Sequence, residues 1–426
     1  ATDAEDWTII KEGTNVFVGY DSLETTASVL RYRKVTSKGK EAYQLVLDKT
    51  PFYAESGGQV GDTGLLKFGT DVVFIMDTKK ENDLIIHFTD RLPDLIKGEV
   101  MAKVDNEKRL KTAVHHSATH LLHAALRLVL GNHVAQKGSL VNSDYLRFDF
   151  SHFAKITDEE LKEVERIVNE KIRENNPVVI TQMKKEEAVQ TGAMALFGEK
   201  YGDTVRVVTM DPSYSIELCG GTHVAATGAL GFFKITSEGA VAAGVRRIEA
   251  LSGAAAETYI NQQIEFLRGI REFLKNPKDI FKAIQSLNDE NAALKKSVEK
   301  AEQAQLLILR DELMTMVEVI NGASFIGAIV EVNSADALKK LAFDLKSVVP
   351  NPVIVLTAAI DGKAQVVLLF DEGLVAEKSL DAGATVKQKI APLIKGGGGG
   401  QKSLATAGGQ NTADLQQVID VVRQLL

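Results

Sequence analysis

Four residues in two short segments have the types and spacing of ligands for one metal ion. His116 and His120 stand four positions apart, so on a helix their imidazole rings project from the same face. Cys219 and His223 frame the segment CGGTH, in which two glycines permit a tight turn that brings a thiolate and an imidazole to one ion. Imidazole and thiolate are ligands that Zn²⁺ prefers, whereas Ca²⁺ and Mg²⁺ prefer oxygen. The pattern therefore predicts a zinc site.

The spacing leaves the role of that site open. Four protein ligands are typical of a closed structural site, whereas hydrolysis needs a position for water or substrate. Glu217 is a weak candidate for supporting a zinc ligand, because a carboxylate beside an exposed turn is commonly solvated. The other histidines are left out of the ligand set, since they lie off the shared helix face, a turn further along it, or without a partner: His87, His115, His123, His133 and His152.

Two helices and several strands are expected to carry these residues. Lys108–Leu130 contains no Gly or Pro, has apolar residues at helical spacing and ends at Gly131, which predicts a helix. Thr157 can cap a second helix, with Glu160 in the capping-box position. The sequence then returns to strands, at Val205–Thr209 and Leu230–Ile235. We place this α/β region, which includes all four ligands, at residues 106–255.

Three further regions flank it. Residues 1–105 contain short β-branched segments separated by Gly and Asp turns, which predicts an N-terminal β-barrel. Residues 256–322 carry apolar residues on alternating three- and four-residue steps, interrupted at Pro277, and form either an antiparallel helical hairpin or one kinked coiled-coil arm. Residues 323–426 alternate strand and helix patterns, which predicts a C-terminal α/β domain. The expected fold class is therefore α+β and multidomain.

Length and composition support a multidomain globular protein. The 426 residues exceed one ordinary core, and contents of 45% hydrophobic and 25% charged residues are average. No run of about 18 uncharged apolar residues occurs, so no membrane span is expected. The single cysteine cannot form an internal disulfide, and no signal peptide is visible, which predicts a cytoplasmic location. The net charge of −7 argues against RNA binding through one broad basic field, so any RNA contact is expected to come from local patches.

Three motifs resemble the editing domain of alanyl-tRNA synthetases: His116–His120 (HSATH), Gly131–Ser139 (GNHVAQKGS) and Glu217–His223 (ELCGGTH). Threonyl-tRNA synthetases share the four-ligand pattern, but LCGGTH resembles the alanyl version. Thr50–Asp62 resembles that family's β-barrel domain, and the glycine run with Leu404–Gly409 resembles its C-terminal tRNA-binding module. The resemblance starts where the aminoacylation core should already have ended. Together with the missing initiator Met, this predicts a synthetase fragment without the alanine-activating core.

The resemblance implies hydrolysis of the ester in mischarged seryl- or glycyl-tRNA(Ala), with Zn²⁺ on the four ligands. Discrimination between amino acids that differ by one small group is worth only about 1–3 kcal/mol, which is why a second site is useful. It further implies that Thr119 hydrogen-bonds a seryl side chain or the attacking water, that Gln136 orients water or the substrate amine, and that Arg246 contacts the terminal adenosine or its phosphate. The expected partners are tRNA(Ala) and mischarged aminoacyl-tRNA, with a homodimer formed through the arm and the C-terminal domain.

The glycine run is expected to be a loop whose amides cradle RNA phosphates, helped by flanking lysines: Lys395, Gly396, Gly397, Gly398, Gly399, Gly400 and Lys402. Composition alone favours a flexible linker there. Two other functions stay open. One is a free-standing trans-editing protein with the same site, and the other is a non-catalytic tRNA-binding module in which zinc only holds the fold. A phosphoesterase is disfavoured, because the sequence has no aspartate-rich metal centre.

Overall fold

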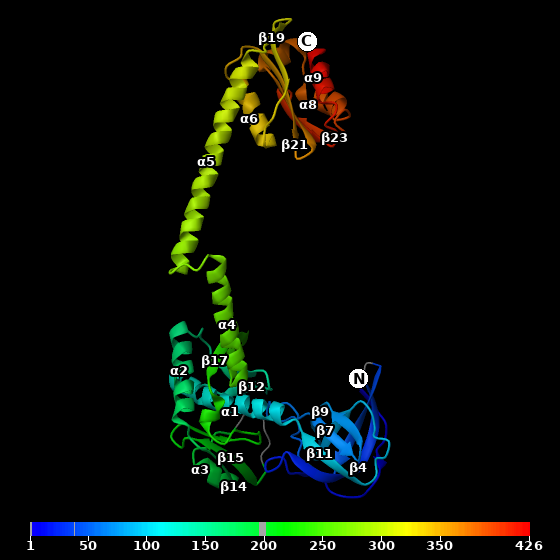
Figure 1. Cartoon of the computed structure of the whole chain (residues 1–426), viewed down its shortest axis with the longest axis vertical. Coiled ribbons are helices and arrows are strands. Elements are labelled where there is room, and N and C mark those ends of the chain that lie inside the picture. The colour runs from blue at the N-terminus through cyan, green and yellow to red at the C-terminus, as the bar shows by residue number, and fades with distance from the viewer. Residues whose placement is uncertain (1, 38, 196–201) are drawn as a thin grey trace. The chain divides into compact units, whose positions relative to one another are not determined.

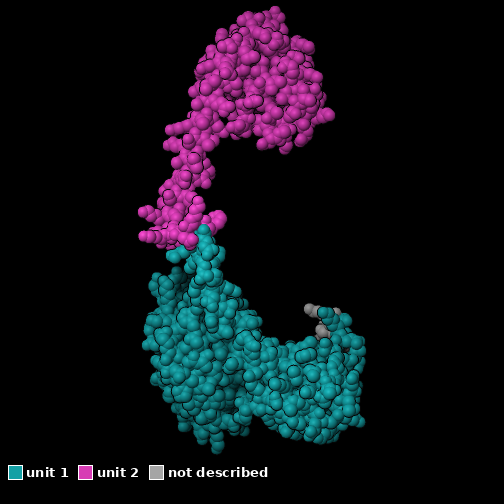
Figure 2. All heavy atoms as spheres, in the orientation of Figure 1, with its two compact units in different colours: residues 1–272 teal, residues 273–426 magenta. Residues whose placement is uncertain are grey.

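The computed structural model describes residues 2–37, 39–195 and 202–426. It divides into two compact units, Ala1–Glu272 and Phe273–Leu426, which are coloured separately in Figure 2. Figure 1 labels the helices and strands. Each unit combines helices with sheets, so the chain is a mixed α/β protein with more than one compact unit, as the sequence predicts.

The N-terminal part of the first unit is a sheet that closes on itself. Its strands follow the order β8-β7-β11-β4-β5-β10-β9. The two ends of this order, β8 and β9, are separated in the chain only by Met76, whose N–H donates to the Phe88 carbonyl at 2.9 Å. The closed sheet therefore has the form of a barrel. Its strands are β4 (Glu24–Ser37), β5 (Lys40–Leu47), β7 (Gly64–Phe68), β8 (Asp71–Ile75), β9 (Asp77–Glu81), β10 (Leu84–Thr89) and β11 (Glu99–Val104).

Short strands complete this part of the unit. β1 (Thr2–Ala4) and β2 (Thr8–Ile9) pair with β4, and β3 (Val16–Phe17) pairs in parallel with β6 (Lys49–Thr50). The core of the closed sheet is apolar, because alternate residues of each strand point inward. Buried members include Leu45, Leu47, Phe52 and Leu66.

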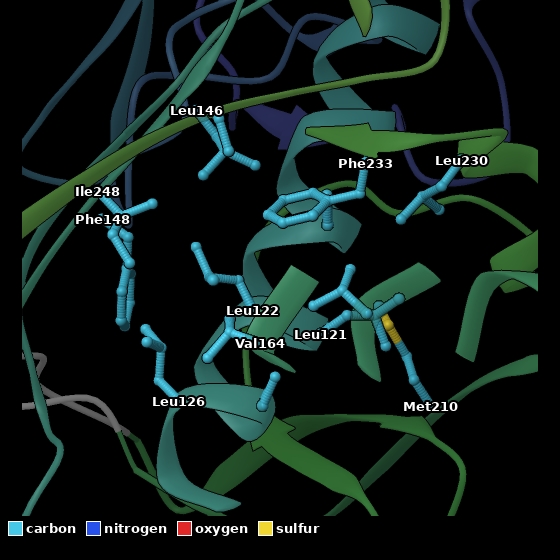
Figure 3. Close-up of a cluster of buried hydrophobic side chains, with 14 of the residues drawn as sticks. Leu121, Leu122, Leu126, Leu146, Phe148, Val164, Met210, Leu230, Phe233 and Ile248 are labelled. Atoms are coloured by element: carbon cyan, nitrogen blue, oxygen red, sulfur yellow. The ribbon is translucent and has the colours of Figure 1, made fainter. Parts of the chain in front are cut away.

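The second part of this unit packs helices against two antiparallel sheets. α1 (Asn106–Leu130) and α2 (Asp158–Glu174) cover a sheet of order β12-β13-β18-β17. Figure 3 shows apolar side chains of both helices and of the surrounding strands meeting in one core. The strands of this first sheet are β12 (Gln136–Val141), β13 (Leu146–Ser151), β17 (Phe233–Ala242) and β18 (Val245–Ser252). The second sheet contains β14 (Val178–Lys184), β15 (Thr204–Met210) and β16 (Ser215–Leu218), and α3 (Lys185–Gln190) packs beside it.

Most local predictions for this part are confirmed. α1 covers the predicted helix, and Thr157 and Glu160 form the predicted capping box at the start of α2. The predicted strand Leu230–Ile235 is wrong at its start, because Thr227–Leu230 forms a short 3₁₀ helix and β17 begins only at Phe233. Gly231 has φ +66° after that helix and allows the chain to leave it.

Two long helices follow, α4 (Ala254–Phe273) and α5 (Ile280–Met314). Between them Lys275 and Asn276 adopt positive φ, and Asp279 caps α5 by accepting from the Lys282 N–H at 3.0 Å. The predicted arm, residues 256–322, therefore contributes a helix to each unit. The domain boundaries predicted at residues 105, 255 and 322 stay predictions. Four of the apolar positions predicted for the arm are exposed on α5: Ile284, Leu287, Leu294 and Val298.

The C-terminal unit is built on one sheet of order β19-β20-β21-β22-β24-β23, with a parallel pair only at β20 and β21. Helix α6 connects that pair and packs on the sheet. The strands are β19 (Glu318–Ile320), β20 (Ala323–Ile329), β21 (Pro352–Ile360), β22 (Lys363–Phe370), β23 (Gly396–Gly400) and β24 (Leu404–Gly409), and the helices are α6 (Ala335–Lys346), α7 (Glu372–Lys378), α8 (Ala382–Thr385) and α9 (Leu415–Arg423). The helix predicted around 382–393 is interrupted, since a π-helical turn, Val386–Ile390, follows α8.

The glycine run corrects a prediction. It is neither a loop nor a linker but β23, the edge strand that pairs antiparallel with β24. Glycine is required where the two backbones approach closely: a Cβ on Gly398 would lie 2.3 Å from the Thr406 carbonyl oxygen, whereas a Cβ on Gly397 would meet nothing within 4 Å. Lys395 and Lys402 flank the strand and are exposed.

No helix in the described parts of the chain is both long enough and apolar enough to cross a membrane.

Candidate metal centre

The structure brings together all four predicted ligands. His116 and His120 project from α1, and Cys219 and His223 stand at the two ends of the turn that follows β16. Their ligand atoms lie within 4.8 Å of one another, and Cys219 Sγ is 3.3 Å from His116 Nε2 and 3.4 Å from His223 Nε2. Ligands about 2.0–2.3 Å from a tetrahedral Zn²⁺ are themselves about 3.3–3.7 Å apart. The cluster therefore has the donor set of a zinc site, and the two distances from Cys219 Sγ match tetrahedral coordination.

The turn depends on its second glycine. Gly221 donates its N–H to Cys219 Sγ at 3.3 Å, which orients the sulfur toward the histidines. A Cβ on Gly221 would lie 2.0 Å from His116 Cε1, which is closer than real Cβ contacts allow. A Cβ on Gly220 would lie 3.9 Å from the Tyr20 hydroxyl, an ordinary contact. Only the second glycine is therefore required by the approach of the His116 ring.

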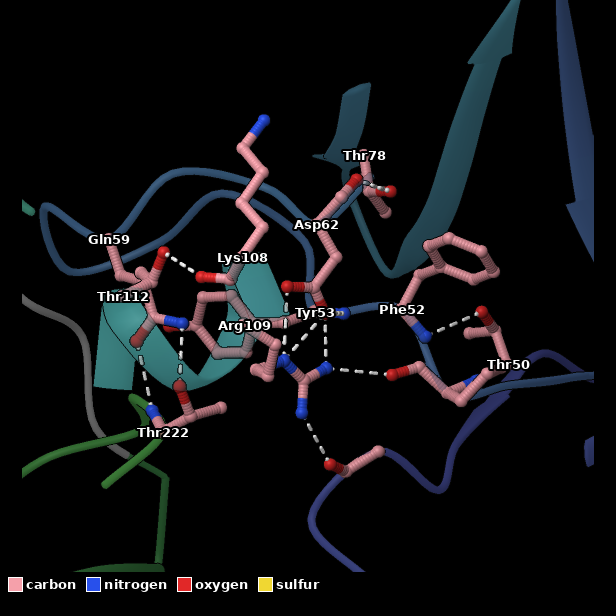
Figure 4. A network of polar contacts seen from close by, with 12 residues as sticks. Thr50, Phe52, Tyr53, Gln59, Asp62, Thr78, Lys108, Arg109, Thr112 and Thr222 are labelled. Atoms are coloured by element: carbon pink, nitrogen blue, oxygen red, sulfur yellow. Dashed lines mark hydrogen bonds and ion pairs between the residues drawn. The ribbon is translucent and has the colours of Figure 1, made fainter. Parts of the chain in front are cut away.

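The closed sheet supplies a residue that the sequence interpretation missed. Gln59 is fully buried, and its Oε1 accepts from His116 Nδ1 at 2.7 Å and from the Thr222 N–H at 2.9 Å. Its Nε2 donates to Thr222 Oγ1 at 2.8 Å, so two hydrogen bonds join Gln59 to the turn (Figure 4). Because Nδ1 of His116 donates to Gln59, Nε2 is left as the ligand atom. In the sequence, Thr50–Asp62 showed only a family resemblance, and Gln59 was not singled out. Nothing in the residue type distinguishes a buried glutamine from an exposed one.

A buried ion pair connects the segment Thr50–Asp62, which contains Gln59, to α1. Arg109 of α1 pairs with Asp62 and also donates to the carbonyls of Gly19 and Pro51, at 2.8 Å each (Figure 4). Asp62 accepts in addition from the Tyr53 N–H at 2.8 Å. These bonds satisfy both charges and hold the loop that presents Gln59 to His116.

Polar side chains also lie beside the other two histidines. Nδ1 of His223 lies 3.0 Å from Ser117 Oγ, which accepts from the Val224 N–H at 3.1 Å. Nδ1 of His120 lies 3.6 Å from Glu217 Oε2. The Ser117 contact leaves Nε2 of His223 facing Cys219, as outer contacts of metal-bound histidines do, whereas the distance from His120 to Glu217 is too long for a hydrogen bond.

Glu217 corrects a prediction. The sequence interpretation ranked Glu217 low as a support for a zinc ligand, because such a carboxylate is commonly solvated, but it is 2% exposed and its Oε1 lies 3.0 Å from His123 Nδ1. β16 ends one residue later, so its alternation turns Glu217 inward toward α1 instead of toward solvent. Burial acts to raise the pKa of Glu217, but the adjacent His120 and His123 lower it below its ordinary value overall. An ionised carboxylate therefore lies beside the ligand His120.

Burial keeps the ligand imidazoles neutral. It lowers the pKa of His116 to about 3, with a further contribution from His120. It also lowers the pKa of His120, and the pKa of His223 falls well below its ordinary value for the same reason, with the nearby His120, His116 and Arg206 adding to the effect. Neutral imidazoles keep the lone pairs that metal coordination requires.

The residues expected to act on the substrate lie on neighbouring elements. The hydroxyl of Thr119 donates to the His115 carbonyl at 2.8 Å within α1. Gln136 and Arg246 occupy one row of the sheet, each paired with Phe150 of β13. Arg246 forms a two-bond ion pair with Glu238, so its charge is already compensated.

A pocket of about 350 Å³ opens beside the cluster. It is lined by Tyr20, Asn106, Arg206, Thr222 and His223, among others. His223 is also the one ligand of the four that is only half-buried. The pocket is therefore the space through which a substrate could approach the metal ligands.

Three family models match parts of the chain. They are described as tRNA synthetases class II (A), at residues 3–108, as the threonyl and alanyl tRNA synthetase second additional domain, at residues 205–249, and as the DHHA1 domain, at residues 322–426. The first match covers the closed sheet, and the second contains Cys219 and His223. The third covers every strand of the six-stranded sheet except β19.

Curated relatives extend over the whole chain. The alanine–tRNA ligase of Cytophaga hutchinsonii is 50% identical over 430 residues, which cover 100% of this chain and 49% of that protein. The chain belongs to the alanine–tRNA ligase family. Other alanine–tRNA ligases, from Bacteroides fragilis and Porphyromonas gingivalis, are 48% and 40% identical, over 100% and 99% of this chain and 48% of each relative. The chain thus spans about half the length of these alanine–tRNA ligases.

One solved structure is also similar, the C-Ala domain of Aquifex aeolicus alanyl-tRNA synthetase. It is 19% identical and has a TM-score of 0.24, with 26% of this chain and 96% of that chain covered. A similarity of this size establishes nothing further about the fold.

Proposed function

We propose that this chain is the editing part of an alanine–tRNA ligase and hydrolyses the ester of seryl- or glycyl-tRNA(Ala). The observation that carries the proposal is the convergence of His116, His120, Cys219 and His223 in one cluster, in which side-chain contacts hold the rings of His116 and His223. Family membership and the match to the second additional domain support the same activity. A hydrolytic second site removes errors that a pocket for alanine cannot reject by binding alone.

The residues present fit Zn²⁺. A soft thiolate and neutral imidazoles form the donor set, and the distances from Cys219 Sγ to Nε2 of His116 and of His223 match tetrahedral coordination. When bound, Zn²⁺ would polarise the ester carbonyl or lower the pKa of a water molecule. Gln59 and Ser117 hold two of the ligand rings, so the ligand atoms are already oriented before metal binds.

Three further residues are proposed to position the substrate. Because the Thr119 hydroxyl donates to the His115 carbonyl, its oxygen remains an acceptor for a seryl hydroxyl or a water. Gln136 is half-buried and can orient a water or the substrate amine through its amide. Arg246 would have to exchange its ion pair with Glu238 for an RNA phosphate, so its role depends on the family resemblance.

The burial of three ligands also suits a structural zinc site in a non-catalytic tRNA-binding module. The half-buried His223 and the adjoining pocket favour hydrolysis, because they give a substrate access to the ligand set. A trans-editing protein with the same site is separated from a synthetase fragment by the native start codon, not by the geometry.

The C-terminal unit is proposed to bind tRNA. β23 presents its backbone at the edge of the sheet, between the exposed Lys395 and Lys402, so amide groups and cations lie together where RNA phosphates could bind. The exposed apolar residues of α5 are proposed to pair with a second copy of the chain. The expected cytoplasmic location stays a prediction.

Deacylation assays test the activity. The chain with Zn²⁺ should release serine and glycine from seryl- and glycyl-tRNA(Ala) and spare alanyl-tRNA(Ala), and Cys219→Ala should remove the release of serine. Gly220→Ala changes the same turn without a close contact and serves as the control. A stable seryl ester in the presence of the zinc-loaded chain would refute the proposed hydrolysis.

A further inference from the structure

The pocket beside His223 contains a cation whose charge is not neutralised. Arg206, from β15, lines it together with the exposed Asp21, which is the one carboxylate among its lining residues. No carboxylate in the described part of the chain forms an ion pair with Arg206. By contrast, Arg109 in the same pocket is paired with Asp62. Arg206 therefore differs from its neighbour in having a positive charge available to a ligand.

Part of the Arg206 guanidinium already has a structural task. Nη1 donates to the carbonyls of Cys219 at 2.9 Å and Gly221 at 2.7 Å, which holds the turn of the metal centre. No acceptor in the described residues takes a hydrogen bond from its Nε or Nη2. Two donors thus remain on a planar group that suits bidentate recognition of a phosphate.

An aromatic ring lies against this guanidinium. The Arg206 Cζ is 4.1 Å from the centroid of the Tyr20 ring, and the Tyr20 hydroxyl donates to the Gly220 carbonyl. Tyr20 nevertheless remains 46% exposed and lines the pocket. Exposed aromatic rings beside arginine are a common surface for stacking the bases of single-stranded RNA ends.

We infer that Arg206 and Tyr20 bind the terminal nucleotide of the RNA substrate, with Arg206 on its phosphate and the Tyr20 ring on its base. A pocket of about 350 Å³ is within the range of small-ligand sites, which begins near ~300 Å³. Its position beside His223 places the ribose of such a nucleotide, and any ester on it, next to the metal ligands. The identity of the ligand as an RNA end rests on the proposed function.

Binding of two small probes to the zinc-loaded full chain tests this inference. Adenosine 5′-monophosphate (AMP) and adenosine share the base and differ in the phosphate, and calorimetry measures the affinity for each. In the unchanged chain AMP should bind about 10-fold more tightly than adenosine or better, because of the charged contact. Arg206→Gln should abolish that preference, whereas Arg166→Gln, which removes an exposed arginine of α2, should retain it.

The two probes separate phosphate recognition from a purely structural role. If Arg206 only holds the turn, Arg206→Gln weakens AMP and adenosine equally or leaves both unchanged, and either result overturns the inference. Should Arg206→Gln lose zinc or unfold, Tyr20 decides. Tyr20→Ala should then weaken both probes about 10-fold, while Tyr20→Phe, which keeps the ring and removes the hydroxyl, should bind them normally. Normal binding by Tyr20→Ala contradicts the inference.

Failure of the two proposals can be told apart. If AMP binding follows these expectations but seryl-tRNA(Ala) is not hydrolysed, the proposed function fails and the nucleotide site stands. If seryl-tRNA(Ala) is hydrolysed but the affinity for AMP is the same in the Arg206 and Tyr20 variants as in the unchanged chain, the nucleotide site fails and the proposed function stands.

Discussion

The two glycines of the metal turn should respond very differently to alanine. A Cβ on Gly221 would lie 2.0 Å from His116 Cε1 and 2.3 Å from its Nδ1, whereas the nearest atom to a Cβ on Gly220 is 3.9 Å away. Neither glycine has a positive φ, so the contact with His116 is the difference between them. The ring cannot turn away freely, because Gln59 holds its Nδ1 at 2.7 Å.

The magnitude follows from what must move in Gly221→Ala. Displacing the ring or the turn by about 1 Å or more resembles overpacking, which costs about 1–3 kcal/mol of stability, and it misplaces a ligand. Loss of an outer contact alone typically lowers metal affinity about 10–100-fold, so Gly221→Ala should lose at least that much. Competition with a chromophoric chelator measures the zinc affinity, and urea unfolding measures stability. Unchanged zinc affinity in a folded Gly221→Ala protein would refute this account of the turn.

Three other predictions follow from buried contacts. Gln59→Ala should bind zinc about 10–100-fold more weakly while remaining folded, and Gln182→Ala, on exposed β14, should match the unchanged chain in the same chelator assay. Arg109→Met leaves Asp62 buried without its partner and should lower the free energy of unfolding, measured in urea, by about 3–5 kcal/mol. Arg109→Lys, which keeps a positive charge, should lower it less. Equal stability of Arg109→Met and the unchanged chain would contradict the role of the ion pair. Burial lowers the pKa of His87 to about 4, so between about pH 7.5 and 5 the unfolded chain gains a proton that the folded chain does not. Folding should therefore lose about 2 kcal/mol over this interval that His87→Gln does not lose, and identical pH dependence of unfolding in the two proteins would exclude this effect.

Local sequence signals predicted the elements that carry the metal ligands. The run without Gly or Pro before Gly131 corresponds to α1, and the Thr157–Glu160 pair caps α2. These predictions succeed because helix periodicity and capping depend on residues within a few positions of one another. The prediction of a loop for the glycine run, Gly396–Gly400, was wrong because its conformation is not set by its own residues alone. Its strand conformation depends on pairing with β24, which no local propensity of glycine indicates.

The ligand set could be predicted from residue types, but its surroundings could not. Gln59 reaches His116 across 57 positions, and Glu217 reaches His123 across 94. Such contacts arise from tertiary packing, which turns a residue that looks solvated in the sequence into a buried partner. The ion pair between Arg246 and Glu238 could not be predicted either, because it depends on the register in which β17 and β18 pair.

Metal dependence of deacylation tests the central claim most directly. One preparation of the chain is assayed on seryl-tRNA(Ala) as purified, after removal of metal with a chelator, and after Zn²⁺ is restored, with bound zinc quantified at each stage. The account predicts about one zinc per chain, hydrolysis that disappears with the metal, and recovery when zinc returns. A chain that binds zinc at these four residues yet leaves the ester as stable as buffer does would contradict it.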